Sequence, residues 1–347
     1  TDGTYTAHSK VLAVVTPAKG AKARTSAIDL GNKTASCDML ATEGWAWDKE
    51  NQILTLSGID FMVPFGRSNF VLVDKGVTVV VEGTNYLDYE DVYGDESHIY
   101  FYNNTGDDSY TFTGGGTLYS NYTDDTRVNG DELIIKNGVK LVIDSLRYDQ
   151  GPVTVDGAQL TARYAYVRNN YDYRFTLKNG ARVEVADDID FYSPLTIGAG
   201  CTFLAEGDVS TNNDVTIEEG ALLGLGGRLH MGLSNGKADR VLTVRGTLSA
   251  ADNFVMHSTA ATPVVIAGSA AVTYPVGAEL VKIDSTGYVF QLDGQNITGK
   301  LVISDEEYSA VKVTKIGAIV GKPNADAVLA AGALTPAGAT AVYTWQW

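Results

Sequence analysis

Short strands of alternating apolar and polar residues, each followed by a glycine, recur through the middle of the chain. Residues 175–181, 195–201 and 215–221 share the pattern apolar–Thr–apolar–x–x–Gly, followed by Ala or Cys. Weaker copies occupy 71–76, 133–138, 153–158, 242–246 and 264–268. The glycines at 138, 157, 180, 200, 220, 246 and 268 are 19 to 26 residues apart. Alternation with a period of two predicts half-buried strands, and no stretch sustains the 3.6-residue period of an amphipathic helix.

Each unit carries two further short strands, so the repeat predicts a three-sided coil. Small or apolar residues stand one and three positions after the glycine, as in Ala181 and Val183, and another apolar pair follows near position nine, as in Ile189 and Phe191. This pattern predicts an all-β fold, a single-stranded parallel β-helix (β-solenoid) with three strands per coil and, on precedent, a right-handed path. A β-sandwich of hairpins also has frequent turns, but it would not keep a constant register between glycine and apolar positions.

The repeat divides the chain into four parts. Residues 1–40 are rich in Ala, Thr and Lys, lack the repeat and are expected to form the N-terminal lead or cap that a solenoid needs. Residues 41–275 are expected to form the β-helix, with an insert rich in Tyr, Asp and Asn at about 86–131. The register is lost from Val276, which predicts a strand-rich C-terminal cap over 276–315 and a separate tail over 316–347.

The charge balance narrows the choice of partner. The chain has 26 basic and 42 acidic residues, a formal net charge of −16. This charge disfavours nucleic acid and anionic membranes as partners, and it favours neutral sugars, cations or basic surfaces. No apolar run approaches the roughly twenty residues that span a bilayer, so we expect no membrane insertion.

The two cysteines, Cys37 and Cys201, are too few and too far apart for a metal motif or a disulfide framework. Cys201 occupies the small apolar position of a repeat, which predicts a buried thiol. A disulfide between Cys201 and Cys37 remains the alternative. The four histidines show no metal-ligand spacing, and no cofactor is expected, with calcium bound by acidic side chains as the alternative.

Several motifs together resemble a known group of proteins. Gly44-Trp45-Ala46-Trp47-Asp48, Ile53-Leu54-Thr55-Leu56-Ser57-Gly58, Val79-Val80-Val81-Glu82-Gly83-Thr84-Asn85 and Thr113-Gly114-Gly115-Gly116-Thr117-Leu118 stand in this order. The series resembles β-helical repeat regions of large surface or secreted proteins of Gram-positive gut bacteria, some of them carbohydrate-binding-like. Residues 332–345 resemble the opening strands of bacterial immunoglobulin-like modules. The resemblance implies an extracellular location, secreted or cell-wall associated, within a longer parent protein.

One outward column of the third strand carries side chains that suit catalysis. The column is expected to contain Arg147, Tyr166, Asp190, Ser210 and His230. Polysaccharide lyases and hydrolases that share this fold place acids and bases on such a face. The best catalytic set is Asp187, Asp188 and Asp190 with Arg163, Arg168 or Arg174. Nothing matches a lyase or hydrolase signature, and mixed charges are expected on any solvated face, so the prediction is that the chain is not an enzyme.

The first strand is expected to present a column of threonines, Thr154, Thr176, Thr196, Thr216 and Thr243. Regular threonine columns order water on ice-binding solenoids, but the broad Thr-x-Thr array of such surfaces is missing here. Threonine is common on solvated strand faces, and that ordinary role is the preferred interpretation.

The tyrosine-rich segment offers the best candidate ligand site. Its candidate residues are Tyr86, Tyr89, Asp91, Tyr93, Asp95, Tyr100 and Tyr102. Tyrosine rings stack on sugar rings and carboxylates accept hydrogen bonds from hydroxyls. The alternative is that these tyrosines pack long loops against the solenoid. The sequence therefore predicts a non-enzymatic extracellular surface module, an adhesin, glycan binder or spacer. The alternatives are a polysaccharide lyase or glycoside hydrolase acting on a plant or host glycan, and a purely structural stalk.

Overall fold

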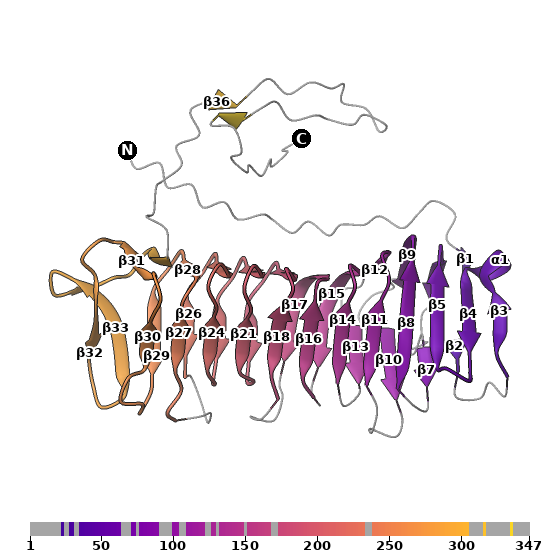
Figure 1. The fold of residues 1–347 in the computed structure, drawn as a ribbon, viewed down its shortest axis with the longest axis horizontal. Helices are drawn as coiled ribbons and strands as arrows, with labels where there is room; N and C mark the ends of the chain where they lie inside the picture. The colour runs from indigo at the N-terminus through magenta and orange to yellow at the C-terminus, as the bar shows by residue number, and fades with distance from the viewer. Residues whose placement is uncertain are drawn as a thin grey trace.

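The computed structural model is an elongated β-solenoid (Figure 1). It describes residues 22–23, 28–30, 35–63, 71–73, 76–89, 99–103, 109–121, 126–129, 132–148, 151–167, 173–232, 238–304, 315–316 and 334–335. Its one helix among these residues is the single turn α1 (Leu40–Glu43). The rod runs from the end that carries α1 to the end that carries β32 (Glu279–Lys282) and β33 (Gly287–Leu292).

The coil has three strands, as the sequence pattern predicts. In one coil these are β18 (Phe175–Lys178), β19 (Arg182–Val185) and β20 (Ile189–Phe191). They pair in parallel with β21 (Leu195–Ile197), β22 (Thr202–Ala205) and β23 (Val209–Thr211) of the next coil. Every residue of one strand therefore lies beside its counterpart one coil further along, about 4.8 Å away. The predicted parallel β-helix is confirmed.

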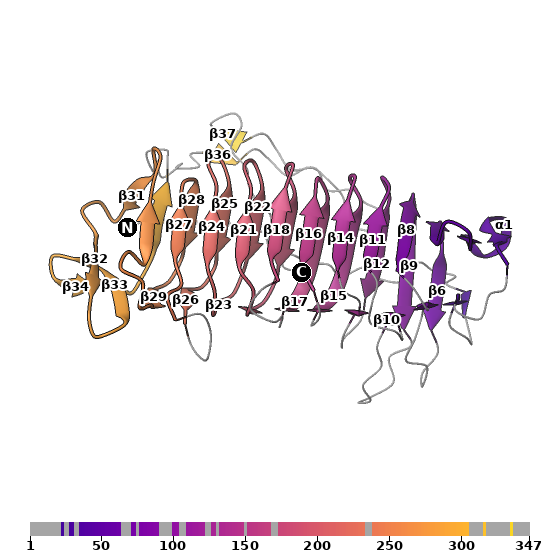
Figure 2. The same ribbon diagram turned by 60° about the horizontal axis from the view of Figure 1, so that its bottom comes forward.

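The first face is a sheet of twelve strands, several of which Figure 2 shows side by side. Its members besides β18 and β21 are β3 (Cys37–Met39), β4 (Trp45–Asp48), β5 (Ile53–Ser57), β8 (Val77–Glu82), β11 (Tyr110–Thr113), β14 (Leu133–Lys136), β16 (Val153–Asp156), β24 (Val215–Ile217), β27 (Leu242–Val244) and β30 (Val264–Ile266). Only β3, β4 and β5 pair antiparallel, as two hairpins at the N-terminal end.

The second and third faces form one continuous sheet, because β15 (Lys140–Tyr148) and β17 (Gln159–Val167) run across the corner between them. The second face also contains β1 (Lys22–Ala23), β6 (Asp60–Val63), β9 (Thr84–Tyr89), β12 (Thr117–Asn121), β19, β22, β25 (Leu222–Leu225) and β28 (Thr247–Ala250). The third face contains β2 (Ile28–Asp29), β7 (Val71–Val73), β10 (Ile99–Asn103), β13 (Thr126–Asn129), β20, β23, β26 (Leu229–Met231) and β29 (Phe254–His257).

The core is a stack of inward apolar side chains between the three faces. Phe175, Phe191 and Phe203 come from different faces and pack edge to face, with ring centroids 5.4 to 6.3 Å apart. Cys201 is buried, as predicted. The glycine before it, Gly200, has a φ of +70°, which other residues adopt rarely, so the repeat needs glycine at this corner.

Both cysteines are free. Cys37 lies in β3 at the N-terminal end, and Cys201 follows β21, which is eight strands further along the first face. A disulfide needs Cα atoms within about 7 Å, whereas eight strand spacings of about 4.8 Å separate these two strands. The alternative of a Cys37–Cys201 disulfide is wrong.

The expectation of an insert at 86–131 is also wrong for the residues that the structure describes. The strands β9 to β13 within this segment pair in parallel in coil register. Tyr110 is fully buried in β11, level with Val77 of β8 and Leu133 of β14. Tyr110 takes an inward position that Val77 and Leu133 take in the neighbouring coils, so the repeat was harder to recognise there.

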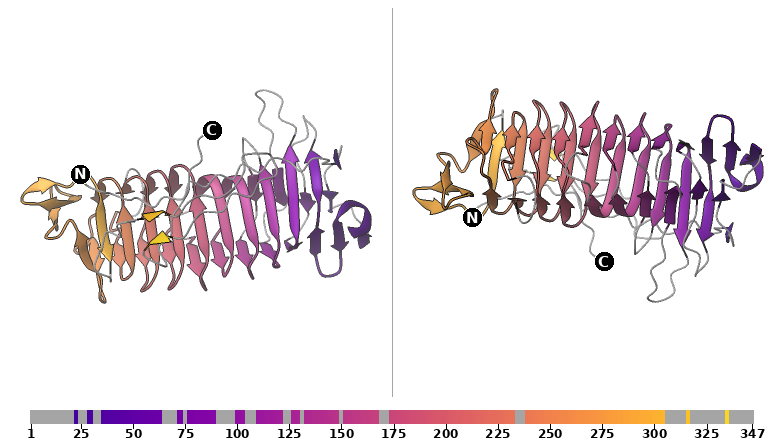
Figure 3. Two further views of the ribbon diagram at one scale, coloured as in Figure 1. Left: turned by 90° about the horizontal axis from the view of Figure 1, so that it is seen from above. Right: turned by 90° about the horizontal axis from the view of Figure 1, so that it is seen from below.

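Antiparallel strands close the C-terminal end of the rod, the orange end in both views of Figure 3. β35 (Leu301–Ser304) pairs with β28 and with β31 (Ala271–Tyr274). β33 pairs with β29, with β32 and with β34 (Gln295–Asn296). We call β31 to β35 the C-terminal cap. The pair β36 (Lys315–Ile316) and β37 (Leu334–Thr335) is separate, and most of the tail at 316–347 lies outside the described residues.

Candidate functional site

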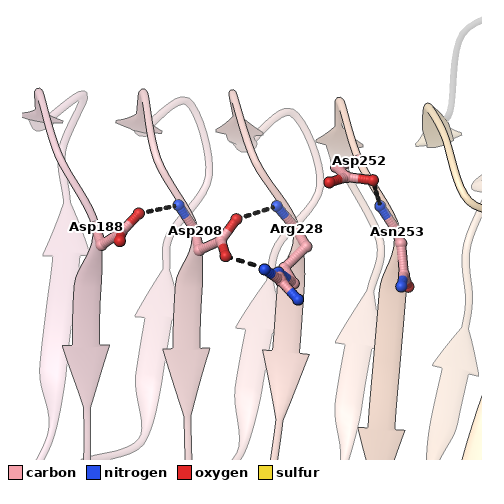
Figure 4. Close-up of polar contacts among 5 residues, drawn as sticks. All are labelled: Asp188, Asp208, Arg228, Asp252 and Asn253. Carbon is pink, nitrogen blue, oxygen red and sulfur yellow. Dashed lines mark hydrogen bonds and ion pairs between the residues drawn. The ribbon is translucent and has the colours of Figure 1, made fainter.

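The corner between the second and third faces carries a row of aspartates that link successive coils (Figure 4). Oδ1 of Asp188 accepts a hydrogen bond from the backbone N–H of Asp208, at 2.7 Å. Oδ1 of Asp208 likewise accepts the backbone N–H of Arg228, at 2.9 Å, while its Oδ2 pairs with Nε of Arg228 at 2.6 Å. Each carboxylate thus satisfies a backbone donor one coil ahead.

At the two ends of this row the aspartate accepts the N–H of the next residue in its own coil. Oδ1 of Asp187 accepts the N–H of Asp188 at 2.9 Å, and Oδ1 of Asp252 accepts the N–H of Asn253 at 2.7 Å. Arg228 has no carboxylate that could accept the N–H of Asn253 one coil further along. Asp252, the residue before Asn253, accepts this N–H instead (Figure 4). Asp187, Asp188, Asp208, Arg228, Asp252 and Asn253 are called the corner ladder below.

Glycines beside the corner ladder make room for the carboxylates. A Cβ on Gly207 would collide with Oδ1 of Asp188, and one on Gly227 would collide with Oδ1 of Asp208. The glycine of one coil and the aspartate of the preceding coil are therefore a matched pair. Two of the candidate catalytic acids, Asp187 and Asp188, have a backbone-capping role in the structure.

The predicted column on the third face is confirmed in register, and its members Asp190, Ser210 and His230 are exposed or half-buried on the outward side. Tyr166 aligns with Arg147 and Asp190, Asp190 with Ser210, and Ser210 with His230. The carboxyl of Asp190 has a raised pKa, because partial burial and the charge of Asp188 outweigh the hydrogen bond from Ser210 that lowers it. The fold thus favours the protonated form of Asp190.

The column ends at a contact between two histidines. The ring of His230 lies 6.2 Å from the ring of His257 on the next coil, measured between centroids. Nε2 of His230 is buried and has no hydrogen-bond partner among the described residues. The pKa of His230 is lowered, first by burial and then by His257 and Arg228, against an opposing effect of Asp208.

Of the candidate catalytic arginines, Arg163 lies at the same corner as the acids, one coil earlier, because Ala162 aligns with Val185 and Ala165 with Ile189. Arg163 is an exposed residue of β17. Arg174 lies at a different corner, where its carbonyl accepts the N–H of Val153 at the start of the first face. Arg168 lies outside the described residues. Among the described residues no group of three or more His, Cys, Asp or Glu side chains is placed to hold a metal ion.

Four of the seven candidate ligand residues fall on two consecutive strands of one coil. Tyr86 and Tyr89 belong to β9 on the second face, and Tyr100 and Tyr102 to β10 on the third. Asp91, Tyr93 and Asp95, between these strands in sequence, lie outside the described residues. Consecutive strands of one coil therefore bracket the segment that the sequence singled out.

Tyr86 contacts Tyr119, which is not among the predicted ligand residues. Its ring stacks on that of Tyr119, with centroids 5.2 Å apart and planes 12° from parallel. The two residues align between β9 and β12 on the outward side, and both are half-buried. The signal in the sequence is that each tyrosine stands three residues after a glycine, Gly83 or Gly116, that opens a strand. We call Tyr86 and Tyr119 the tyrosine pair.

The predicted threonine column on the first face is also confirmed. Thr154, Thr176, Thr196, Thr216 and Thr243 align across five consecutive strands. Ion pairs flank it, between Lys178 and Asp156 at 3.3 Å and between Arg245 and Glu218 at 3.1 Å. The flanking charges are thus paired along the column, which fits a solvated strand face.

Comparisons with protein-family models, curated proteins and solved structures found no significant match. The structure itself defines the class, a three-faced parallel β-solenoid. The resemblance of residues 41–275 to bacterial surface proteins remains a prediction. None of the described helical residues forms a helix long and apolar enough to span a bilayer.

Proposed function

We propose that the chain is a non-enzymatic extracellular module that binds a glycan on the side of a rigid rod. The observation that carries this proposal is the tyrosine pair on the outward side of the second face. Two nearly parallel rings from adjacent coils thus form a fixed aromatic surface. Aromatic rings of this kind supply apolar contact to the C–H faces of sugar rings, and their hydroxyls supply hydrogen bonds.

The neighbours of the tyrosine pair suit a neutral sugar. Thr84 and Thr117 stand two residues before the tyrosines, on the same side of the sheet, and offer hydroxyl groups. Asp60 aligns with Tyr86 one coil earlier, but its Oδ1 is buried, so the hydroxyl groups are the available polar atoms. The net charge of −16 repels anionic polysaccharides. A neutral glycan is therefore the favoured ligand class.

The corner ladder supports the non-enzymatic part of the proposal. General acid–base catalysis needs side chains that are free to exchange protons with a substrate. Asp188 and Asp208 instead accept backbone N–H groups, and Asp208 is also paired with Arg228. Their geometry serves to hold successive coils together.

Binding to neutral polysaccharides, measured by glycan array and titration calorimetry, tests the proposal. Tyr86→Ala and Tyr119→Ala should each weaken binding several-fold, up to about tenfold, because an aromatic contact contributes about 0.5–1.5 kcal/mol. Tyr86→Phe keeps the ring and should retain most of the affinity. Tyr274→Ala, which removes an exposed tyrosine from the C-terminal cap, is the matched control. No binding to any glycan would leave the structural stalk as the function.

The second candidate function, a polysaccharide lyase or hydrolase, is favoured by one observation, the raised pKa of Asp190 beside Ser210. Release of unsaturated or reducing sugar ends from polysaccharides would reveal it. Asp190→Asn should abolish such activity. Asp188→Asn separates chemistry from structure, because an amide oxygen still accepts the N–H of Asp208 but cannot take up a proton as a base.

A further inference from the structure

The contact between His230 and His257 lies where the last coil joins the rest of the rod. His230 belongs to β26, and His257 ends β29, which pairs with β26 on one side and with β33 of the C-terminal cap on the other. His257 itself aligns with Gly287 of the cap. The two rings are 6.2 Å apart and tilted by 37°. Any force between these rings therefore acts between the coil of β26 and the coil that carries the cap.

Nothing among the described residues accepts a hydrogen bond from Nε2 of His230, so a proton on this atom is not stabilised. Nε2 is buried without a hydrogen-bond partner among the described residues. A protonated imidazole donates from both nitrogens, so a proton there would leave a buried donor unsatisfied, which costs free energy. In the neutral tautomer with its proton on Nδ1, Nε2 carries only a lone pair and leaves no donor unsatisfied.

The charged groups around His230 add to this effect. His257, on the next coil, and Arg228, just before β26, both lower the pKa of His230. Asp208, on the preceding coil, acts in the opposite direction, but its carboxylate is already engaged by Arg228. Ser210 and Val255, which align with His230 on either side, are uncharged.

His257 faces an acidic residue of the C-terminal cap. Asp284 lies in the turn before β33, where its Oδ1 accepts the N–H groups of Thr286 and Gly287. These hydrogen bonds lower the pKa of Asp284, and His257 lowers it further. His257 thus lies between His230 on the preceding coil and the carboxylate of Asp284 in the cap.

We propose that His230 and His257 form an acid-sensitive clasp between the coil of β24 to β26 and the last coil with its cap. While His230 is uncharged, its ring lies against that of His257. As the pH falls, His230 takes up a proton beside a buried Nε2 that has no partner among the described residues, β29 is drawn away from β26, and the last coil loosens together with β33. The rest of the rod keeps its structure, because no other histidine pair lies between coils among the described residues.

The sign of the pH dependence follows from the lowered pKa of His230. The unfolded chain binds a proton at the ordinary histidine value of about 6.5, above the value in the folded protein. The stabilising contribution of the clasp is complete above that value and is lost as the pH falls through the lowered, folded-state pKa of His230. The loss should appear only in the part of the rod that the clasp joins.

Histidine NMR tests the first step, since the chain has only four histidines. The ring signals of His230 and His257 are assigned with His230→Gln and His257→Gln. We expect His230 to titrate below the ordinary range and to move back toward it in His257→Gln, which removes one of the charges that oppose protonation. Titration of His230 in the ordinary range or above would overturn the proposal.

Hydrogen exchange tests the second step. Protection factors are compared at about pH 7.5 and about pH 5, on either side of the histidine range. In the wild-type protein we expect protection in β29 and β33 to fall in acid while β18 to β22 stay protected. In His230→Gln this fall should be much smaller. An equal fall in His230→Gln, or a uniform loss along the whole rod, would overturn the clasp, whatever the outcome of the glycan-binding tests.

Discussion

Asp188 accepts, on its Oδ1 atom, the backbone N–H of Asp208, which stands 20 residues later and one coil further along the rod. The contact satisfies a corner N–H group that no strand pairing reaches. Because Asp208 repeats it toward Arg228, the stability of one coil depends on a side chain of the coil before it. This relationship makes the corner ladder testable by single substitutions.

Asp188→Ala should lower the free energy of unfolding by about 1 kcal/mol, the usual net contribution of such a hydrogen bond. Asp188→Asn should cost less, because its amide oxygen still accepts the N–H of Asp208. Denaturant unfolding followed by circular dichroism measures both. Equal losses in the two variants would show that charge, and not the hydrogen bond, is the stabilising factor.

Gly207→Ala should be more damaging than an ordinary glycine substitution. Its Cβ would meet Oδ1 of Asp188 and would lie 2.7 Å from the backbone nitrogen of that residue. Combining it with Asp188→Ala should recover part of the loss, since the carboxylate is then gone but the backbone contact stays. Gly115→Ala is the control, because its added Cβ meets nothing within 4 Å. Thermal melting of the wild type, Gly207→Ala, Asp188→Ala and the double variant gives the coupling between Asp188 and Gly207. Strictly additive effects would contradict a matched pair.

The features that the sequence predicted correctly are those that repeat within one coil. Strand alternation and the corner glycine are local signals, so they predicted the three faces, the burial of Cys201 and the columns that contain Thr196 and Asp190. Each column follows once the glycine of one unit is aligned with the glycine of the next. Residues with the same offset must then be neighbours in space.

The features that were missed depend on contacts between coils, or on a tyrosine at a position that is aliphatic in the neighbouring coils. The capping role of Asp188 is decided by which N–H group lies one coil ahead, and nothing local distinguishes it from a solvated carboxylate. Tyr119 lies 33 positions after Tyr86, because the coils there are long, so their stacking was hidden in a tyrosine-rich segment. Tyr110 filled an inward apolar position, so the repeat was harder to recognise there.

Asp190→Asn should stabilise the protein at neutral pH. The raised pKa of Asp190 means that the fold disfavours its charged form, mainly through partial burial. Its ionisation therefore costs stability as the pH rises through the folded-state pKa, and the cost is absent below the unfolded value of about 3.9. The amide keeps an oxygen for the hydrogen bond from Ser210. Melting temperatures of the two proteins should differ at pH near 7 and converge in acid; a variant that is less stable at neutral pH would show that the Asp190 carboxylate is stabilising.

Phe203→Ala should be the most destabilising of these substitutions. The Phe203 ring is fully buried and packs against Phe175 and Phe191, which come from the other two faces. Removing it leaves a cavity at the centre of the coil, with an expected loss of about 3–5 kcal/mol. Leu204→Ala removes a half-buried side chain of the adjacent, outward position and should cost much less. Because coils contact only their neighbours, the loss should first appear as exchange of amides in β18 to β23, while β5 and β8 stay protected. Similar losses in the two variants, measured by denaturant unfolding, would mean that the phenylalanine cluster does not hold the three faces together.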